Sequence, residues 1–297
     1  MYQVYLLDLK NMENTASNNN QNPLSKYFRQ PAIYMELPSK GQFWADNSVE
    51  LPVTGEIPVY PMTARDEVTL RTPDALMNGS GVVEVIHSCC PSIKDAWKMP
   101  SVDVDAVLIG IRIASYGHGM DLDTKCPHCS EENRHSVDLR TILSSITCPD
   151  YNKKIDINEL KIKIRPQPFF GVNKQNTISF EEQRILEALE KSDLSQEERT
   201  AQINASMSKL VQIGIDTVAS GTEFIELNDG VVVDNPAHIS EFYNNADGAV
   251  IRSIQKRISE INAEAQIKSQ KVACLACTKE YQIPLEFDYA NFFANGS

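Results

Sequence analysis

Two short segments, KCPHCS at 125–130 and ACLACT at 273–278, each hold a pair of cysteines two residues apart. A two-residue spacer lets a tight turn aim two thiolates at one ion, and zinc takes four such ligands at tetrahedral corners. One structural zinc ion per chain is therefore predicted to be bound by Cys126, Cys129, Cys274 and Cys277. Four cysteines close the coordination shell and leave no position for water, so the predicted role is fold stabilisation and not catalysis.

Apolar residues follow the two cysteine pairs at matching distances. Val137 and Leu139 lie 11 and 13 residues after the first cysteine of one pair, and Leu285 and Phe287 lie at the same distances in the other. Two knuckles that each lead into a strand are typical of a zinc ribbon. Here 144 residues separate the two pairs, so the intervening chain is predicted to be an insertion into the ribbon.

Other readings of the cysteines stay open at this point. Ribbon spacings are usually nearer about 15–20 residues, so the pairs could belong to separate sites or be free thiols. A redox disulfide would need a thioredoxin-like helix start, which neither pair has. His128 and His135 are alternative ligands, although four cysteines already suffice and solvated histidines are the simpler interpretation.

The composition is that of a globular chain with a strong acidic excess. The 297 residues are 42% hydrophobic and 23% charged, and 40 acidic side chains against 28 basic ones give a formal charge of −12. Such a charge repels phosphate backbones and anionic lipid surfaces, so no nucleic-acid or membrane partner is expected. No apolar run reaches the length needed to cross a bilayer, and no secretory signal is present at the N-terminus, which favours a cytoplasmic location.

The pattern of elements predicts an α+β fold in three parts. Residues 1–30 are predicted to be a flexible leader, because the polar stretch ASNNNQNP at 16–23 cannot offset its ordering entropy. Residues 31–148 together with 267–297 are predicted to form a mixed α/β domain closed by the zinc ribbon. A mainly helical insertion is expected over 149–266.

Periodicity and capping residues predict the elements themselves. Strands are expected at 32–37, 49–51, 57–60, 120–123, 135–139 and 160–164. Helices are expected after Thr63, after Pro73, through Val82–Ile86, from a Ser101 cap to Gly117, from capping boxes at Ser179 and Ser195, from Asn235-Pro236, and through Val250–Ile261. The charged run Arg65-Asp66-Glu67 is interpreted as a solvated first helical turn.

Catalytic patterns are not evident in the sequence. His87 stands near Cys89 and Cys90, but on a mostly apolar helix these are more often core residues than a nucleophile and its base. Cys148 is isolated. The sequence has no phosphate-binding loop, nucleophile elbow, H-E-x-x-H or deaminase motif, so the protein is not expected to be an enzyme.

Five blocks of the N-terminal half resemble a known family. They are LPSKG at 37–41, LPVTGEIPVYPMTARDE at 51–67, TPDALMNG at 72–79, VDAVLIGIR at 104–112 and DLDTKCPHC at 121–129. In this order they are similar to the N-terminal part of the baseplate hub-assembly proteins of T-even-type contractile-tailed phages.

The resemblance implies a phage tail protein without an active site. It implies a structural or assembly role at the baseplate hub, with hub or tape-measure proteins as partners, in the host cytoplasm during assembly and then in the virion. Self-association is a further expectation, because amphipathic helices suit protein–protein contacts. The alternative hypothesis is a cytoplasmic zinc-ribbon adaptor that binds nucleic acid or transcription machinery.

Overall fold

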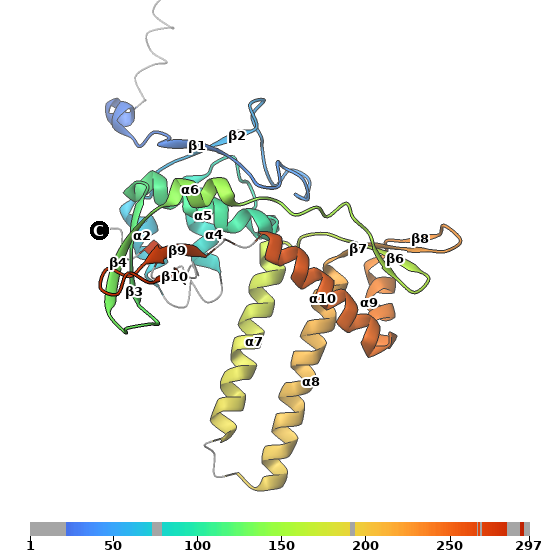
Figure 1. The fold of residues 1–297 in the computed structure, drawn as a ribbon. Helices are drawn as coiled ribbons and strands as arrows, with labels where there is room; N and C mark the ends of the chain where they lie inside the picture. The colour runs from blue at the N-terminus through green and yellow to red at the C-terminus, as the bar shows by residue number, and fades with distance from the viewer. Residues whose placement is uncertain are drawn as a thin grey trace, which may run out of the picture. The chain divides into compact units, whose positions relative to one another are not determined.

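The computed structural model describes residues 22–72, 79–190, 194–265, 267, 269–283 and 292–293 (Figure 1). The contacts divide the chain into two units, Met1–Gln30 and Pro31–Ser297. The described part of the first unit holds one short 3-10 helix, η1 (Pro23–Tyr27), capped by the Asn22 side chain. Every other described element belongs to the second unit.

The first hydrophobic core surrounds the helix α5 (Ser101–Tyr116), which is buried along most of its length. An antiparallel ribbon of β1 (Ile33–Glu36) and β2 (Glu56–Val59) packs on it. Gly110 permits this approach, since a Cβ atom there would lie 2.5 Å from Met35 Sδ. Among the described residues, this region also contains the helices α2 (Ala64–Leu70), α4 (Ser80–Cys89), η2 (Ala96–Lys98) and α6 (Leu139–Ser145).

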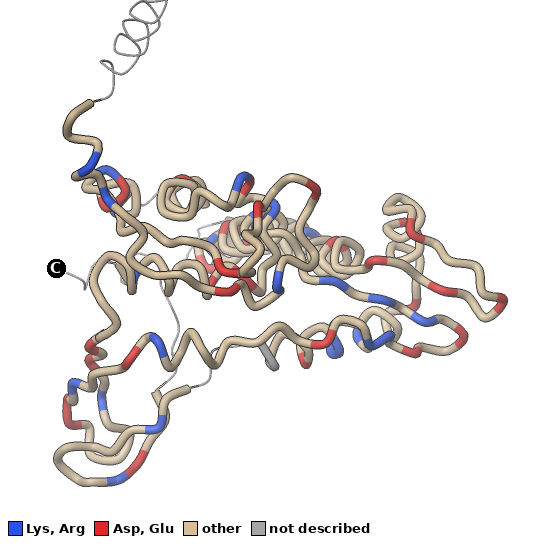
Figure 2. Tube along the Cα trace, turned by 90° about the horizontal axis from the view of Figure 1, so that it is seen from above, with Lys and Arg blue, Asp and Glu red and all other residues tan. Residues whose placement is uncertain are grey.

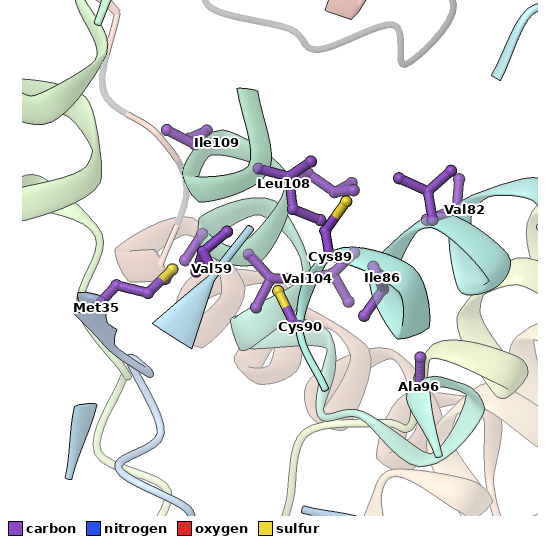
Figure 3. Packing of buried hydrophobic residues seen from close by; sticks show 14 of the residues in the cluster. Met35, Val59, Val82, Ile86, Cys89, Cys90, Ala96, Val104, Leu108 and Ile109 are labelled. Atoms are coloured by element: carbon purple, nitrogen blue, oxygen red, sulfur yellow. The ribbon is translucent and has the colours of Figure 1, made fainter. Parts of the chain in front are cut away.

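Side chains from these elements interlock in one cluster. Figure 3 shows Val82, Ile86, Cys89, Cys90, Val104 and Leu108 side by side between α4 and α5, with Met35 and Val59 near the ribbon. Phe292 and Phe293, which lie at the other end of the chain, belong to the same cluster. The buried Arg112 of α5 holds this segment, because its Nη1 donates a hydrogen bond to the Phe292 carbonyl oxygen.

A second core forms around a four-stranded antiparallel sheet. The strands, in the order in which they pair, are β5 (Ile155–Ile157), β6 (Leu160–Ile164), β7 (Thr222–Leu227) and β8 (Val232–Val233). The helices α9 (Pro236–Asn245) and α10 (Gly248–Ala265) supply Ile239, Tyr243, Ile254 and Ile261 to its core. The buried Tyr243 hydroxyl lies 2.9 Å from the Thr222 hydroxyl of β7.

Two long helices between β6 and β7 lie side by side (Figure 1). They are α7 (Phe169–Glu190) and α8 (Gln196–Ser220). The Lys209 ammonium of α8 lies 2.7 Å from the buried carboxylate of Glu182 on α7, and this pair joins the helices. Ser195 and Glu198 form a reciprocal capping box at the start of α8.

Several sequence predictions of single elements are confirmed. The helix starts at Thr63, Ser195 and Asn235 occur with the predicted side-chain caps, and α5 ends at Gly117. The strands at 32–37, 57–60, 120–123 and 160–164 match described strands to within a few residues. The fold mixes helices with small sheets, as the predicted α+β class requires. The helix expected after Pro73, and Leu285 and Phe287, lie outside the described residues.

Other predictions of elements are wrong, and local physical reasons account for them. The residue that caps α5 is Pro100, and Ser101 is already helical. Ser179 is no helix start, because α7 begins at Phe169, just after Pro168, and runs through it. The segment 49–51 forms an isolated bridge from Val49 to Ile93 and no strand. Leu139 opens α6 instead of ending a strand.

One further expectation needs correction. Asp66 is buried, and its carboxylate accepts hydrogen bonds from Thr63 and, at 3.0 Å, from the Ser88 hydroxyl. This helical turn is therefore not solvated throughout. The described part of the segment 149–266 holds the four helices α7, α8, α9 and α10 and also the whole four-stranded sheet. The division into a leader, a ribbon domain and an insertion stays a prediction.

Candidate metal centre

Two β-hairpins present the cysteine pairs. In one, β3 (Gly119–Lys125) pairs with β4 (Glu132–Asp138), and in the other β9 (Gln270–Ala273) pairs with β10 (Glu280–Ile283). The pairing leaves loops of equal length, 126–131 and 274–279, between the strands. Each loop begins with the first cysteine of a pair. In both hairpins, one strand therefore precedes the cysteine pair and its partner strand follows it.

The two loops have the same backbone hydrogen bonds. In each, the N–H of the first cysteine donates to the carbonyl oxygen five residues later, at 2.9 Å and 3.0 Å. The carbonyl oxygen of that cysteine accepts from the N–H four residues later, also at 2.9 Å and 3.0 Å. The residues at this fourth position, Ser130 and Thr278, have left-handed φ angles of 63° and 58°. Two unrelated sequences thus adopt one knuckle geometry.

The four cysteine sulfur atoms meet in one place. All four Sγ atoms lie within 4.8 Å of one another, with 3.8 Å between Cys126 and Cys277 and 3.6 Å between Cys129 and Cys274. Zinc–sulfur bonds of about 2.3 Å at tetrahedral corners place neighbouring sulfur atoms about 3.8 Å apart. A disulfide would need about 2.05 Å, and all four cysteines are free. The donor set fits a four-coordinate metal ion.

Backbone N–H groups surround these sulfur atoms. The N–H of His128 points at Cys126 Sγ from 3.4 Å, and the N–H of Cys277 points at Cys274 Sγ from 3.5 Å. Donation from Cys277, and then from Ala276, lowers the pKa of the Cys274 thiol to about 6. For the neighbouring Cys129 thiol, the backbone hydrogen bond at Glu131 lowers the pKa, but desolvation and hydrogen bonds with the other three thiols outweigh it and raise the pKa to about 12. A lowered pKa favours the thiolate, which is the form that binds a metal.

Asn133 of β4 links the two knuckles, and sequence reasoning missed it. Only 3% of this residue is exposed. Its amide Nδ2 lies 3.6 Å from Cys274 Sγ and donates to the Glu131 carbonyl oxygen at 3.0 Å, while its Oδ1 accepts from the N–H of Leu275 at 2.8 Å. In the sequence it is a single asparagine between the first cysteine pair and the strand predicted at 135–139, and only the position of the second knuckle shows its role.

Tyr281 of β10 forms a second link between the hairpins. Its hydroxyl lies 2.7 Å from the Thr124 hydroxyl and 3.0 Å from His135 Nε2. The side chain is buried, in a small cluster with Cys126, Cys274 and Ile283. His135 is therefore occupied with Tyr281, and His128 is exposed, so the structure brings neither histidine into the group of four ligands.

The other cysteines lie elsewhere. Cys89 and Cys90 are fully buried in the first core, and burial raises the pKa of Cys90. His87 is exposed, which corrects its interpretation as a core residue, and its Nε2 accepts from the N–H of Ala96 at 2.9 Å. Cys148 is half-buried and outside the cluster. None of these side chains belongs to the four-thiol group.

Fold and site together define a chain in which two segments remote in the sequence meet at a four-thiol centre that could hold a metal ion. The family described as T4 bacteriophage base plate protein matches residues 31–294, and the chain belongs to this family. It is therefore a phage baseplate structural protein, and this family membership indicates a non-enzymatic component of the virion tail. No curated protein and no solved structure matches the chain. Within the described residues, no helix is long and apolar enough to span a membrane.

Proposed function

We propose that this baseplate protein acts at the hub, as a structural or assembly component that contacts hub or tape-measure proteins. The family match over residues 31–294 carries the baseplate assignment. The hub role is supported by the five ordered sequence blocks between residues 37 and 129. The protein would meet its partners in the host cytoplasm during assembly and stay in the tail.

The four-thiol centre is proposed to hold one zinc ion. Cys126, Cys129, Cys274 and Cys277 would be the ligands, and the ion would supply no open coordination position. It would fix the hairpin β3–β4 against β9–β10, whose cysteines are 145 positions apart at their nearest contact. Such a clip limits the freedom of the intervening chain, since closing a long loop costs conformational entropy in the unfolded state.

Elemental analysis of the purified chain tests the zinc proposal. We expect one zinc per chain, and its loss in Cys274→Ser. The matched control is Cys148→Ser, because this cysteine is half-buried and lies outside the cluster. Metal-free protein with four titratable thiols at these positions would overturn the zinc assignment.

The helix pair α7–α8 is proposed to supply the partner surface. Its inner side is already occupied, since Glu182 and Ser206 are buried where the helices meet. Met207 and Val211 lie one turn apart on α8 and remain about half exposed or more, at 50% and 65%. Apolar side chains at this spacing form a stripe that a helix or groove of another protein could cover.

Charge substitution on this stripe tests the partner surface. Met207→Glu with Val211→Glu should prevent assembly of complete baseplates, and any self-association, while the chain still folds. Ala205→Glu is the matched control, because this exposed residue lies on the opposite side of the same helix. Complete baseplates formed by the double variant would exclude the stripe as the contact.

The alternative, an adaptor for nucleic acid, finds less support. The strands beside the thiols carry Asp121, Asp123 and Glu132, and the exposed Arg134 is paired with Asp123 at 2.8 Å. Figure 2 shows acidic and basic residues interspersed along the described trace. Acidic strands oppose the approach of a phosphate backbone.

A further inference from the structure

A cleft of about 550 Å³ opens where the loop that follows β1 meets the four-stranded sheet. Its walls combine aromatic and cationic side chains: Phe43 and Trp44 from the loop, Lys98 at the end of η2, and Lys163 and Arg165 from β6 and its extension. Lys98 is paired with Asp95 at 3.1 Å, which leaves Lys163 and Arg165 as the cations to consider. Glu223 of β7 is the one carboxylate among the lining residues. The cleft is therefore cationic, in a chain whose formal charge is −12.

The cations of the cleft differ from their neighbours on the same strand. Lys161 lies 3.9 Å from Glu226, which also pairs with Lys154, so charge is balanced there. Lys163 and Arg165 form no ion pair with any described residue; the Lys163 ammonium only donates to Asn152 Oδ1 at 3.3 Å. Two positive charges thus face the cleft without a carboxylate partner in the part of the chain that the structure describes.

Buried contacts hold Phe43 and Trp44, the aromatic side chains of the cleft wall, in place. The buried carboxylate of Asp103 accepts hydrogen bonds from the Ser39 N–H and from Trp44 Nε1, both at 2.8 Å. Phe43 has a left-handed φ of 68°, which is costly for a bulky residue, and its ring packs edge-on against Tyr151. Strained backbone that the surroundings hold in place is a feature of ligand-binding sites.

We propose that this cleft binds an acidic peptide segment in an extended conformation. Lys163 and Arg165 are two positions apart on a near-extended chain, which spaces their backbones by about 6.8 Å. Carboxylates at alternate positions of an extended peptide have the same spacing. The rings of Phe43 and Trp44 offer apolar contact to the side chains between them. The inference rests on the proposed function in one respect: the peptide segment is assigned to another tail protein.

A peptide fits the surroundings better than a nucleic acid does. The cleft has room for a short segment, whereas a polynucleotide would continue past it over a predominantly acidic chain. Two carboxylates of a peptide can be paired by Lys163 and Arg165 alone. A polynucleotide carries a negative charge on every phosphate, and Glu223 in the wall of the cleft would repel this higher charge density.

Fluorescence anisotropy with the full-length chain tests the site. The probe is a labelled ten-residue peptide in which glutamate alternates with valine, and the same peptide with glutamine in place of glutamate is the charge control. We expect binding of the glutamate peptide only, weakened by salt. Lys163→Gln with Arg165→Gln should reduce affinity about tenfold. Lys161→Gln, outside the cleft on the same strand, should change it less than about twofold.

Three results would overturn the proposal: equal binding of the glutamine peptide, an equal loss in Lys161→Gln, or stronger binding of oligothymidine that displaces the peptide. If the double variant fails to fold, Arg165→Gln alone decides, because Arg165 is exposed and its loss leaves the core intact. The anisotropy measurement reports peptide affinity and depends neither on metal content nor on baseplate assembly. A failure of the proposed function is therefore distinguishable from a failure of this proposal.

Discussion

At the scale of single residues, buried polar side chains link segments that are far apart in the sequence. Asn133 links the two cysteine loops, and Asp103 holds the loop that carries Trp44. Both side chains are almost fully enclosed, where an unsatisfied polar group would be costly. Each therefore makes several hydrogen bonds at once and fixes segments that are remote in the sequence.

Replacing Asn133 should weaken metal binding. Asn133→Ala removes the amide that contacts Cys274 Sγ and the acceptor for the Leu275 N–H, so we expect the zinc affinity to fall about 10- to 100-fold. Competition with a chromogenic zinc chelator measures this change. Asn204→Ala, at an exposed position of α8, is the control and should leave the affinity unaltered.

Removing the Asp103 carboxylate should destabilise the first core. In Asp103→Ala the Ser39 N–H and Trp44 Nε1 lose their acceptor, and we expect the free energy of unfolding to fall by about 3 kcal/mol. Urea unfolding provides the measurement. Asp46→Ala is an exposed substitution in the loop that carries Trp44 and should cost less than about 0.5 kcal/mol; equal effects would contradict the role of Asp103.

The same carboxylate predicts a pH dependence. Burial raises the pKa of Asp103, and this effect outweighs the hydrogen bonds from Ser39 and Trp44 that lower it. The folded chain therefore holds this proton more tightly than the unfolded chain. Its contribution to stability is fully present below the ordinary pKa of about 3.9 and is lost as the pH rises through the raised value. Urea unfolding across this range should show the difference between wild type and Asp103→Ala decrease with rising pH; a constant difference would contradict it.

At the scale of elements, backbone geometry fixes where helices begin. Gly79 caps α4 with a left-handed φ of 75°, and a Cβ atom there would lie 2.8 Å from the Asn173 side chain. Its position therefore needs glycine for both conformation and space.

Gly79→Ala should lower the free energy of unfolding by about 1–2 kcal/mol, because the left-handed conformation and the close contact both become strained. Thermal unfolding measures the effect. Gly119→Ala is the matched control: a Cβ atom there meets nothing within 4 Å, so the midpoint should hold or rise slightly. A Gly79 variant as stable as the wild type would show that α4 can begin in another way.

At the scale of the whole molecule, the C-terminal part of the chain returns to segments that come much earlier in the sequence. The second cysteine pair meets the first, and Phe292 and Phe293 pack into the core that Met35 and α5 begin. The region between carries its own sheet and core. This connectivity brings segments that are far apart in the sequence together at the four-thiol centre.

Removal of metal should therefore affect the unfolding of the whole chain. Since an ion that binds only the folded state stabilises it, a strong zinc chelator should lower the thermal midpoint of the wild type. Cys274→Ser should already unfold at the lower temperature and should not respond to the chelator. A chelator effect of equal size in both proteins would contradict a stabilising ion at this site.

Much of the local structure followed from local signals. The caps at Thr63, Ser195 and Asn235 and the alternation of β6 act within one turn or one strand, so the sequence alone predicts them. The strand β7 was missed because its buried residues, Thr222 and Ile225, are three positions apart and do not show the period-two alternation that marks a half-buried strand.

The sequence by itself determined the four candidate ligands, because a C-x-x-C spacing already constrains a turn. Only the tertiary structure decided that the two turns face each other and that Asn133 and Tyr281 link them. It also decided that Asp103 holds the loop whose Trp44 lines the basic cleft. These contacts join residues up to 157 positions apart. The physical reason is that hydrogen bonds and charge pairing depend on distance in space, and no local periodicity encodes which remote side chains a fold brings within reach.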